Sequence, residues 1–468
     1  MEITRKKRSS VTSDDSNNFR NFLRDLEEIG ELIKIKKTVS PRFELPAVGS
    51  KFEGKQAVLF EKVEGSKMSV ACNVLGTRKR FCLSIGVKDE KQIHTRITSS
   101  ISKFSSPNKN LGQASFHNNY SNDLMDLPII THFEKDAGPY ITSSVVFARD
   151  SQSGNQNSSI HRLLRLDAKH MAIRMVEGRH LHRCFSFAKD HNEDLRVSIA
   201  IGLHPAISIA AAYQAAYGVD EMEIANSLLD GKLALSKSDY TQLFIPAHAE
   251  IVLEGRILKD VSHEEWMVEM LRTYDFKRKQ PVFELNKMWF RDNAVYHDIL
   301  PGFSEHRLLM GLPVETKMFE AVKNVVPNTY AVYLTEGGSN WLDAVIQIRK
   351  NFEGEPKNAI MAAFASHPSL KMAIVVDEDI NPINPVAVEY AISTRCQADK
   401  GIVIITNAKG SSLDPSSDQD NLVTAKVGID ATATLLKSKE RFEIARIPGS
   451  DDIDISEYIN KGKIHSVL

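Results

Sequence analysis

The hydrophobic and polar residues at the start of the chain predict a helix followed by a strand. Apolar side chains spaced three or four residues apart, as on one face of a helix, are Phe19, Phe22, Leu23, Leu26 and Ile29. Gly30 ends this helix, and residues 31–39 alternate as in a strand. Short strands and helices continue beyond it. The pattern therefore predicts an N-terminal α/β domain over residues 19–105.

The middle of the chain is dominated by runs that resemble strands. Residues 103–120 are rich in Ser, Asn, Lys and Gly and are expected to form a linker or long loop. Five strand-like runs follow at close spacing: YITSSVVFAR, MAIRMV, VSIAIGL, AEIVLEGRI and VFELNKMWF. Such spacing predicts a barrel-like β domain, which we place at residues 106–312. The most apolar stretch, Val197–Tyr217, contains Pro205 and polar residues, so it predicts a buried strand, a turn and a helix.

In the last third of the chain, strands alternate with helices. KMAIVVDEDI has the continuous apolar character of a buried parallel strand. Asn384 can cap the next helix with Pro385 at its first position, and GIVIIT is the following strand. This order predicts a three-layer α/β domain over residues 313–468. The expected fold class is therefore α/β (α+β), with three domains.

Composition and charge narrow the choice of function. A chain of 468 residues is too long for one core, and 42% hydrophobic with 25% charged residues is typical of a globular protein. The net charge of -1 gives no reason to expect nucleic acid or a membrane as a partner. The four cysteines form no CxxC pair and no signal peptide is recognised, which favours a cytoplasmic location. Residues 1–18 are polar, and we expect a disordered tail, although its basic cluster could also be a targeting signal or an anion patch.

Three segments place polar side chains in apolar surroundings. They are GNQNSSIHRLLRL with Asn157, EGRHLHR with His180 and His182, and IPAHAEIVLEG with Glu250. An amide, an imidazole and a carboxylate together suit Mn²⁺ or Mg²⁺ better than a soft metal. A single His or Glu at the end of a strand is more often structural, so these residues alone do not identify a site.

A fourth segment, SHEEWMVEMLRTYD, brings carboxylates together. Glu264 and Glu269 are five residues apart, with Glu265 between them. Two nearby carboxylates and an arginine form a plausible proton-transfer set, because like charges raise one pKa and the arginine lowers another. A solvated acidic helix is the alternative interpretation of this segment.

These segments, in this order, resemble the UbiD decarboxylase family from about Phe19 to Pro448. The motifs that carry the resemblance are FRNFLRDLEEIGELIKI, NSSIHR, IGLHPA, PAHAEIVLEG, RDNAVYH, VVDEDIN, AISTR and AKVGIDAT. The resemblance implies an N-terminal α/β domain, a central split β-barrel that binds prenylated FMN, and a C-terminal α/β domain. It also implies a homo-oligomer, a dimer or hexamer, and a flavin prenyltransferase that supplies the cofactor.

The resemblance assigns site residues by their positions in these motifs. The implied metal ligands, for Mn²⁺ and with K⁺ possible nearby, are Asn157, His180 and Glu250. The implied cofactor-binding residues are Asn157, Ser159, Ile160, His161, Arg162, Arg179 and His180. The implied catalytic set is Arg162, Glu264 and Glu269. His182 is the rival of His180, and Glu265 the rival of Glu264, because EEWMVE lacks the Gly and Pro that many relatives carry there. Lys371 and His367 are further candidates for anion contacts.

The family chemistry implies a non-oxidative decarboxylase. The prenylated flavin accepts the electrons left when CO₂ departs from an α,β-unsaturated acid, and a carboxylic acid then returns a proton to carbon. Several details match the archaeal-type branch, which implies trans-anhydromevalonate 5-phosphate, a mevalonate-pathway acid for isoprenoid synthesis, as substrate. His161 and Arg174 would contribute to its phosphate site. The alternatives are 4-hydroxy-3-polyprenylbenzoate or another aromatic acid, a non-catalytic flavin-binding protein, and a metal-dependent hydrolase.

Overall fold

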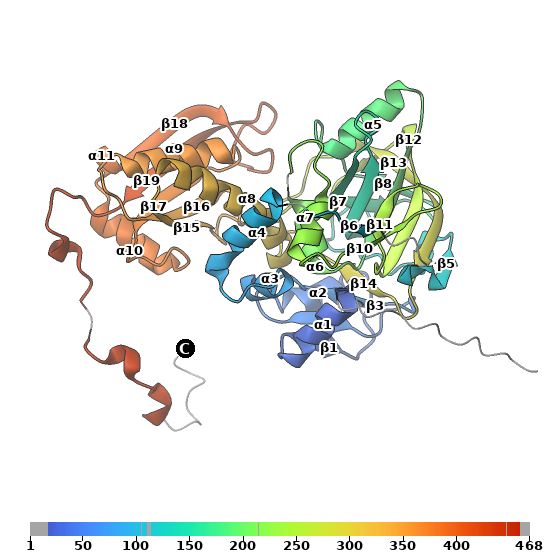
Figure 1. The fold of residues 1–468 in the computed structure, drawn as a ribbon, viewed down its shortest axis with the longest axis horizontal. Coiled ribbons are helices and arrows are strands. Elements are labelled where there is room, and N and C mark those ends of the chain that lie inside the picture. The colour runs from blue at the N-terminus through green and yellow to red at the C-terminus, as the bar shows by residue number, and fades with distance from the viewer. Residues whose placement is uncertain (1–16, 104, 110–113, 214, 446, 459–468) are drawn as a thin grey trace, which may run out of the picture.

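The computed structural model describes residues 17–458 except 104, 110–113, 214 and 446 (Figure 1). The predicted disordered tail therefore lies outside the described residues, apart from Asn17 and Asn18. Helix α1 (Phe19–Glu28) is confirmed, and the side chain of Asn18 caps it by accepting the backbone N–H of Asn21. Phe19, Phe22, Leu23 and Leu26 are buried because the helix packs on the N-terminal sheet, whereas Ile29, which follows the last helical residue, is exposed.

The N-terminal sheet has four strands in the order β1-β2-β3-β14. Their bounds are Leu32–Ile35, Ala57–Phe60, Ser69–Cys72 and Val295–Asp298. Helices α2 (Glu44–Ser50), α3 (Arg78–Ser84) and α4 (Ile93–Ser102) complete this part of the fold. Strand β14 comes from the region predicted as the central domain and lies parallel to β3. The first and second parts of the chain thus share a sheet.

A closed barrel of six strands forms the centre of the molecule and confirms the expected barrel. The strand order is β12-β9-β6-β7-β8-β13, and pairing between β12 and β13 closes the ring. The bounds, in chain order from β6 to β9 and then β12 and β13, are Tyr140–Arg149, Gln156–Arg165, His170–Ile173, Leu195–Ile201, Ile251–Glu265 and Arg278–Phe290. Strand β7 carries the NSSIHR motif. In the predicted linker, β5 (Asn119–Ser121) extends the sheet beyond β13.

Three helices and a small sheet surround the barrel. The helices are α5 (His180–Asp190), α6 (Pro205–Ala212) and α7 (Glu221–Leu228). The small sheet has the order β11-β10-β4, with bounds Phe244–Pro246, Ala234–Lys237 and Asn108–Lys109. The predicted strand, turn and helix in Val197–Tyr217 are β9 and α6, and Pro205 is the first residue of the helix. No helix among the described residues is long and apolar enough to cross a membrane.

The C-terminal part is a three-layer α/β arrangement, as predicted. Its sheet has the order β15-β16-β17-β19-β18, with bounds Thr329–Leu334, Asp343–Ile348, Met372–Asp377, Val423–Ala431 and Ile402–Lys409. Helix α9 (Glu355–Ser366) and the second half of α8 (Ser304–Val325) pack on one face, and α10 (Pro385–Arg395) on the other. Asn384 caps α10 as predicted. GIVIIT is strand β18, but it lies antiparallel at the edge, because β19 takes the parallel position beside β17.

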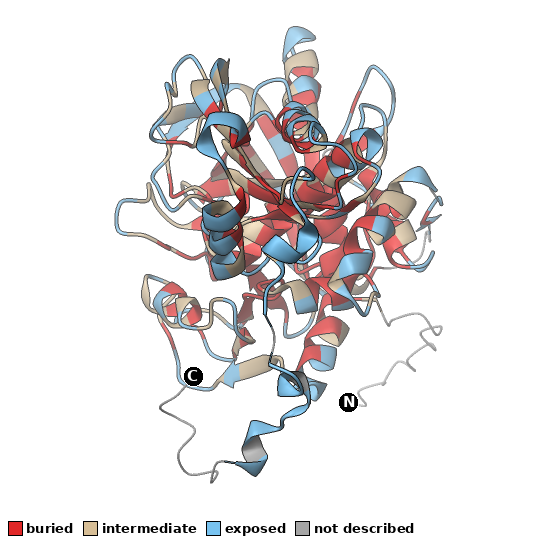
Figure 2. Ribbon diagram, turned by 90° about the vertical axis from the view of Figure 1, so that its left-hand side faces the viewer, coloured by how far each residue is buried: buried red, intermediate tan, exposed pale blue. Residues whose placement is uncertain are grey.

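Helix α8 connects the central and C-terminal parts. It runs without interruption across residues 312 and 313, where the sequence predicted a domain boundary. Leu309 near its start packs with the residues around α6, and Met318 further along packs with those of α9. We therefore propose α8 as a shared element between the domains at 106–312 and 313–468. Figure 2 shows buried residues concentrated in the barrel and the sheets, while the last described segment is mostly exposed.

Candidate active site

A cavity of about 310 Å³ lies between strand β7, helices α5, α6 and α7, and the start of α8. Strand β7 supplies a continuous run of lining residues, 157–162, and other polar lining residues come from the surrounding elements. Apolar lining residues include Leu181, Ala211, Met267, Ile299, Leu309 and Met310. The cavity has the mixed lining typical of a site for a cofactor and a small substrate.

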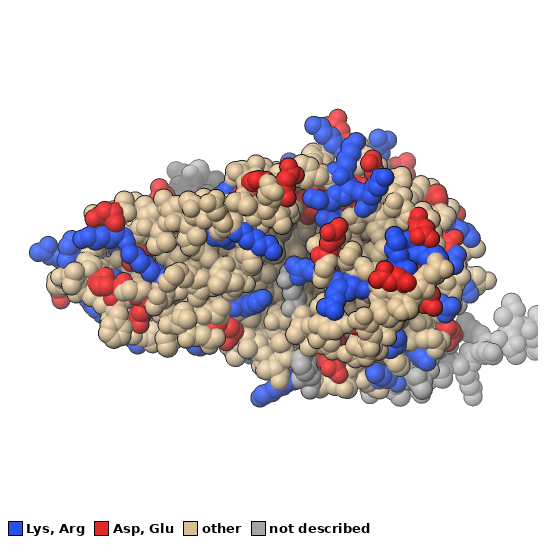
Figure 3. Space-filling model, turned by 90° about the horizontal axis from the view of Figure 1, so that it is seen from above, with Lys and Arg blue, Asp and Glu red and all other residues tan. Residues whose placement is uncertain are grey.

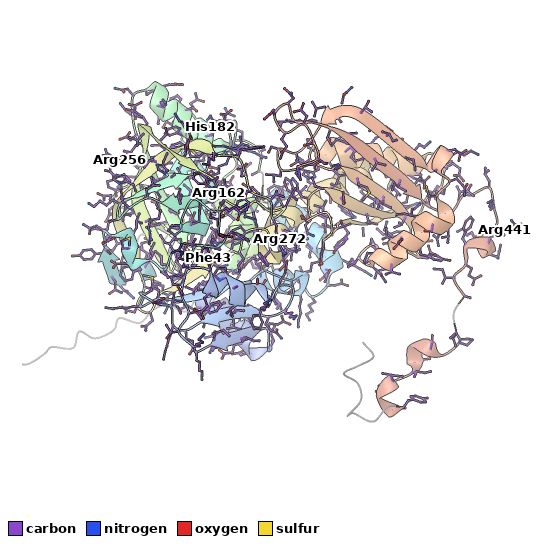
Figure 4. All side chains as sticks on the ribbon, turned by 180° about the vertical axis from the view of Figure 1, so that it is seen from behind. Phe43, Arg162, His182, Arg256, Arg272 and Arg441 are labelled. Carbon is purple, nitrogen blue, oxygen red and sulfur yellow. The ribbon has the colours of Figure 1, made fainter. Side chains whose placement is uncertain are left out.

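A buried arginine and three carboxylates lie at one end of the cavity. Arg162 donates from Nε and Nη2 to the two oxygens of Glu265, at 3.0 and 2.8 Å. Its Nη1 donates to Glu269, and its Nη2 also donates to Asp275 at 3.2 Å. The hydroxyl of Tyr140 donates to Glu265 at 3.1 Å. Figure 4 places Arg162 in the interior of the central domain.

The structure replaces Glu264 with Glu265 in the predicted catalytic set. Glu265 is fully buried against Arg162, while Glu264 is exposed. The two residues are neighbours on β12, so their side chains point to opposite faces of the sheet. The predicted role of Glu264 therefore passes to its rival, Glu265.

Glu269 begins the turn that follows β12. Its N–H donates to the carbonyl of Thr273 at 2.9 Å, and its side chain is 20% exposed toward the cavity. Burial raises the pKa of Glu269, Arg162 lowers it, and the carboxylates of Asp275 and Glu265 raise it further. The net direction is upward. Glu269 is thus suited to hold a proton that it can give away.

A second polar group lies at the other end of the cavity. The amide Nδ2 of Asn157 lies 3.5 Å from Nδ1 of His180 and 3.2 Å from Oε1 of Glu221. His180 Nδ1 is 3.9 Å from the same Glu221 oxygen. Glu221 begins helix α7 and also accepts the N–H of Ser158 at 2.8 Å. An amide, an imidazole and a carboxylate are ligands that suit a hard divalent cation.

The predicted convergence of Glu250 with Asn157 and His180 is wrong. Glu250 is fully buried elsewhere, where Arg20 donates to both of its oxygens at 2.7 Å. The N–H of Val295 donates to it at 3.0 Å. Its carboxylate therefore joins helix α1 to strand β14 instead of facing the cavity. Among the described residues, no three His, Cys, Asp or Glu side chains are grouped so that they could hold a metal ion.

Between the rival histidines, the geometry favours His180. His180 lines the cavity. His182, two residues further along on α5 and labelled in Figure 4, lies 3.5 Å from both the N–H of Gly178 and the hydroxyl of Ser186. Arg179 precedes α5 and also lines the cavity. Beside this end, the buried hydroxyl oxygen of Ser158 has no hydrogen-bond partner among the described residues. The polar end therefore has unfilled hydrogen-bonding capacity.

The remaining predicted residues divide between the cavity and the C-terminal part. Ser159, Ile160, His161 and Arg174 line the cavity. Burial lowers the pKa of His161 to about 4, and its Nδ1 donates to the carbonyl of Arg174 at 2.7 Å. His161 is therefore neutral near pH 7 and cannot supply a positive charge. Lys371 pairs with Asp414 at 2.7 Å, and His367 Nε2 donates to the carbonyl of Trp341 at 3.0 Å, both in the C-terminal part.

Sequence reasoning missed three residues of the site: Glu221, Asp275 and His306. His306 lines the cavity near the start of α8 and accepts the N–H of Gly302 on Nδ1 at 3.0 Å. Its Nε2 must then carry the hydrogen. Burial and the nearby arginines Arg162 and Arg307 lower its pKa to about 4. The capping of α7 by Asp220 was a local indication of a helix start at Glu221, but nothing in the sequence linked that start to β7.

Known protein families match all three parts of the chain. Three domain families match: the 3-octaprenyl-4-hydroxybenzoate carboxy-lyase N-terminal, Rift-related and C-terminal domains, at residues 23–99, 106–304 and 307–431. The chain is 41% identical to the anhydromevalonate phosphate decarboxylase of Methanothermobacter thermautotrophicus, over 91% of this chain and 98% of that protein. It is 49% identical to the protein of that name from Methanocaldococcus jannaschii, over 70% and 76%.

A solved structure extends this similarity to three dimensions. The UbiD-class enzyme HmfF from Pelotomaculum thermopropionicum, in complex with FMN, superposes with a TM-score of 0.92 at 38% identity. The match covers 94% of this chain and 100% of that one. An evolved dimeric form of the same enzyme, in complex with prenylated FMN, has a TM-score of 0.88 at 36% identity, over 95% and 100%.

Proposed function

This chain belongs to the UbiD family of carboxy-lyases, as its motifs predicted, and from that premise we propose that it decarboxylates trans-anhydromevalonate 5-phosphate with prenylated FMN. The observation that carries the proposal is that Glu265, Arg162 and Glu269 are joined at one end of a cavity whose other end holds Asn157, His180 and Glu221. The archaeal relatives named for this substrate support the choice of acid.

The cavity residues fit a flavin with a phosphate group. The apolar side chains Ile160, Leu181 and Met310 can contact its ring system, and the buried Ser158 hydroxyl lacks a partner that a ligand would supply. The N-terminus of α5, with Arg179 beside it, favours the negative charge of a phosphate. When bound, the prenylated flavin supplies an electrophilic carbon that accepts the electron pair left by CO₂.

We propose that Asn157, His180 and Glu221 hold a divalent cation, with Mn²⁺ as the expected ion and K⁺ possible nearby. Glu221 is buried, and among the described residues its only basic neighbour within 4 Å is His180. A buried carboxylate without a full positive charge beside it is costly, and a bound cation removes that cost. The same cation would face the cofactor phosphate next to Arg179.

The chain's own residues supply the proton that returns to carbon and keep water away from the reacting carbon. Glu269 carries the proton to be transferred, because burial and neighbouring carboxylates raise its pKa. Glu265 and Tyr140 fix the plane of Arg162, and Arg162 in turn orients Glu269. The apolar side chains around the cavity limit access of water to the reacting carbon. Arg174 lines the same cavity and is the proposed contact for the substrate phosphate, since His161 is neutral.

Turnover is tested by producing the chain together with a flavin prenyltransferase, its proposed cofactor supplier, and measuring CO₂ release. We expect rapid release from trans-anhydromevalonate 5-phosphate, and slow release from its dephosphorylated form and from 4-hydroxy-3-polyprenylbenzoate. Preference for the aromatic acid would replace the proposed substrate. Binding of prenylated FMN without turnover of any acid would make the chain a flavin-binding protein instead.

We further propose a homo-oligomer in the cytoplasm. One neighbouring enzyme of this fold was solved in a dimeric form. Figure 3 shows basic and acidic side chains mixed over one face of the molecule, which gives no reason to expect nucleic acid there. Light scattering of the purified protein measures the assembly directly, and a mass of one chain would contradict the oligomer.

A further inference from the structure

Residues 266–275, which follow β12, form a tight hairpin with a carboxylate on each side. The hairpin is closed by an antiparallel bridge between Val268 and Tyr274, and the N–H of Asp275 donates to the carbonyl of Met267 at 2.9 Å. Glu269 ends its outgoing arm, opposite Thr273, and Asp275 lies on its returning arm. The fold therefore brings both carboxylates to Arg162 from one short segment.

Asp275 is more deeply buried than Glu269. Its side chain is 3% exposed, and Oδ2 accepts from Arg162 Nη2 at 3.2 Å. Oδ1 accepts the N–H of Phe276 at 2.9 Å and lies 3.4 Å from Arg278 Nη2. Nε of Arg174 lies 3.8 Å from Oδ2. Asp275 is thus held by several neighbours, and Arg162 is its link to Glu269.

The guanidinium of Arg162 is shared among three carboxylates. Glu265 takes the fork formed by Nε and Nη2, Asp275 takes a second contact from Nη2, and Glu269 pairs with Nη1. Arg174 and Arg278 lie at the edge of this cluster beside Asp275, whereas Arg162 is the cation that pairs directly with all three carboxylates. Of the three acids, Glu269 is the most exposed and the only one that lines the cavity, among the described residues.

We propose that Asp275 is a positioning residue for the decarboxylation: it holds Arg162 in place and shares its positive charge, so that Glu269 keeps its proton. This inference rests on the proposed function, in which Glu269 is the acid. Asp275 itself does not touch the substrate in this proposal. It acts through Arg162.

The other groups around Glu269 oppose or assist this effect. Arg162 and Arg174 favour the ionised form of Glu269, while Asp275 and Glu265 favour the protonated form and act with burial, so its pKa is raised. Further out, Tyr140 donates to Glu265, and Asp136 holds the hairpin through the N–H of Val268. The neutral His306 lines the same cavity. Asp275 is therefore one of two fixed negative charges that keep the proton on Glu269.

The test compares Asp275→Asn with Asp275→Glu. Asn keeps an acceptor for Arg162 but removes the charge, so the pKa of Glu269 should fall. Activity that needs protonated Glu269 is lost as pH rises through that pKa. This loss forms the basic limb of the pH–rate profile, and the limb should move to lower pH by about one unit. Asp275→Glu keeps the charge and should restore the wild-type limb. A basic limb that does not move in the Asn variant overturns the proposal.

A second readout does not need turnover. In flavin-free protein, the infrared C=O stretch of protonated Glu269, identified by its loss in Glu269→Gln, should disappear at lower pH in Asp275→Asn than in wild type. If wild type releases no CO₂ but this band still shifts, the proposed function fails and the coupling of Asp275 to Glu269 stands. If wild type is active and the band stays in place, the coupling fails alone.

Two further variants separate this effect from general destabilisation. Glu315→Gln alters another buried carboxylate with an arginine partner, Arg78, and should lower stability without moving the limb. If Asp275→Asn does not fold, Arg278→Gln serves instead, because the Arg278 side chain is 36% exposed. Removing that positive charge should move the limb to higher pH, by less than the Asn shift. No upward movement there contradicts the proposal.

Discussion

Two clusters of glutamate and arginine in this protein look alike but differ in how their charges are arranged and in whether they face a cavity. In the cluster around Glu250, one carboxylate faces two arginines, Arg20 and Arg291, and also accepts a backbone N–H. In the cluster around Arg162, three carboxylates share one central arginine, and Arg174 and Arg278 lie at its edge beside Asp275. Glu250 is fully buried and lines no cavity among the described residues, whereas Glu269 of the second cluster faces a cavity.

The difference shows which features of a buried ion pair indicate chemistry. Burial and a bidentate arginine occur in both clusters, so neither feature identifies an active site. Burial together with neighbouring carboxylates raises the pKa of Glu269, and the cavity gives its proton access to a substrate. Glu250 lacks that cavity, and its cluster instead joins α1 to the barrel.

The largest effect is expected from Glu269→Gln. This change keeps the size of the side chain but removes the transferable proton, so the rate of CO₂ release should fall about 10²–10⁴-fold. Prenylated flavin should still bind, because the proposed flavin contacts lie on β7, α5 and α8. Single-turnover kinetics with the flavin-loaded protein measure the effect. A near-normal rate would remove Glu269 from the mechanism and leave Glu265 as the candidate acid.

The cluster around Glu250 should respond in stability. Glu250→Gln leaves Arg20 and Arg291 without a charged partner, and breaking a buried pair in this way costs about 3–5 kcal/mol. Urea unfolding measures the loss, and the rate per folded molecule should stay near that of wild type. A variant as stable as wild type but inactive would show that Glu250 belongs to the reaction after all.

A third change tests which glutamate serves the metal. Glu221→Gln should weaken Mn²⁺ binding by more than about 100-fold. Mutating a residue that only supports a metal ligand already lowers metal affinity by about 10–100-fold, and Glu221 is proposed as a ligand itself. Titration calorimetry with Mn²⁺ checks this, with Glu250→Gln as the matched control that should keep its affinity. The opposite result for the two variants would restore the assignment made from the sequence.

The smallest effect is expected from Glu264→Gln. Glu264 is exposed on β12, so the variant should differ from wild type by less than about 0.5 kcal/mol in stability and should keep its rate. Glu265→Gln, one residue further, should lose activity because Arg162 loses its main partner. Equal activity of the two variants would contradict the placement of Glu265 at the site.

The sequence predicted what depends on local pattern or on matched motifs. The spacing of Phe19, Phe22 and Leu26 predicted α1, and Asn384 with Pro385 predicted the start of α10. The motif on β7 identified Arg162, and the structure joins it to Glu269 as expected. These elements are set by residues close to one another along the chain.

The errors arose where a side chain's direction depends on distant structure. Glu264 and Glu265 differ by one strand position, and a register shift between Leu258 and Ser262 separates them from the buried half of β12. A slip of one residue reverses the face of a strand, so spacing alone could not choose between them. Glu221 meets Asn157 only because α7 packs on β7, a contact between segments 64 residues apart.

The late strand β14 has a consequence for how the protein is made. The N-terminal sheet is complete only when β14 pairs with β3, yet about 220 residues separate Cys72 from Val295 along the chain. At a synthesis rate of roughly 5–20 residues per second, the ribosome needs about 10–45 s to supply that strand. During this interval the edge of β3 lacks its final neighbour, and the emerging chain is open to wrong pairing. The three parts therefore do not fold as independent units during synthesis, because the N-terminal sheet is completed only after the central part of the chain has been made.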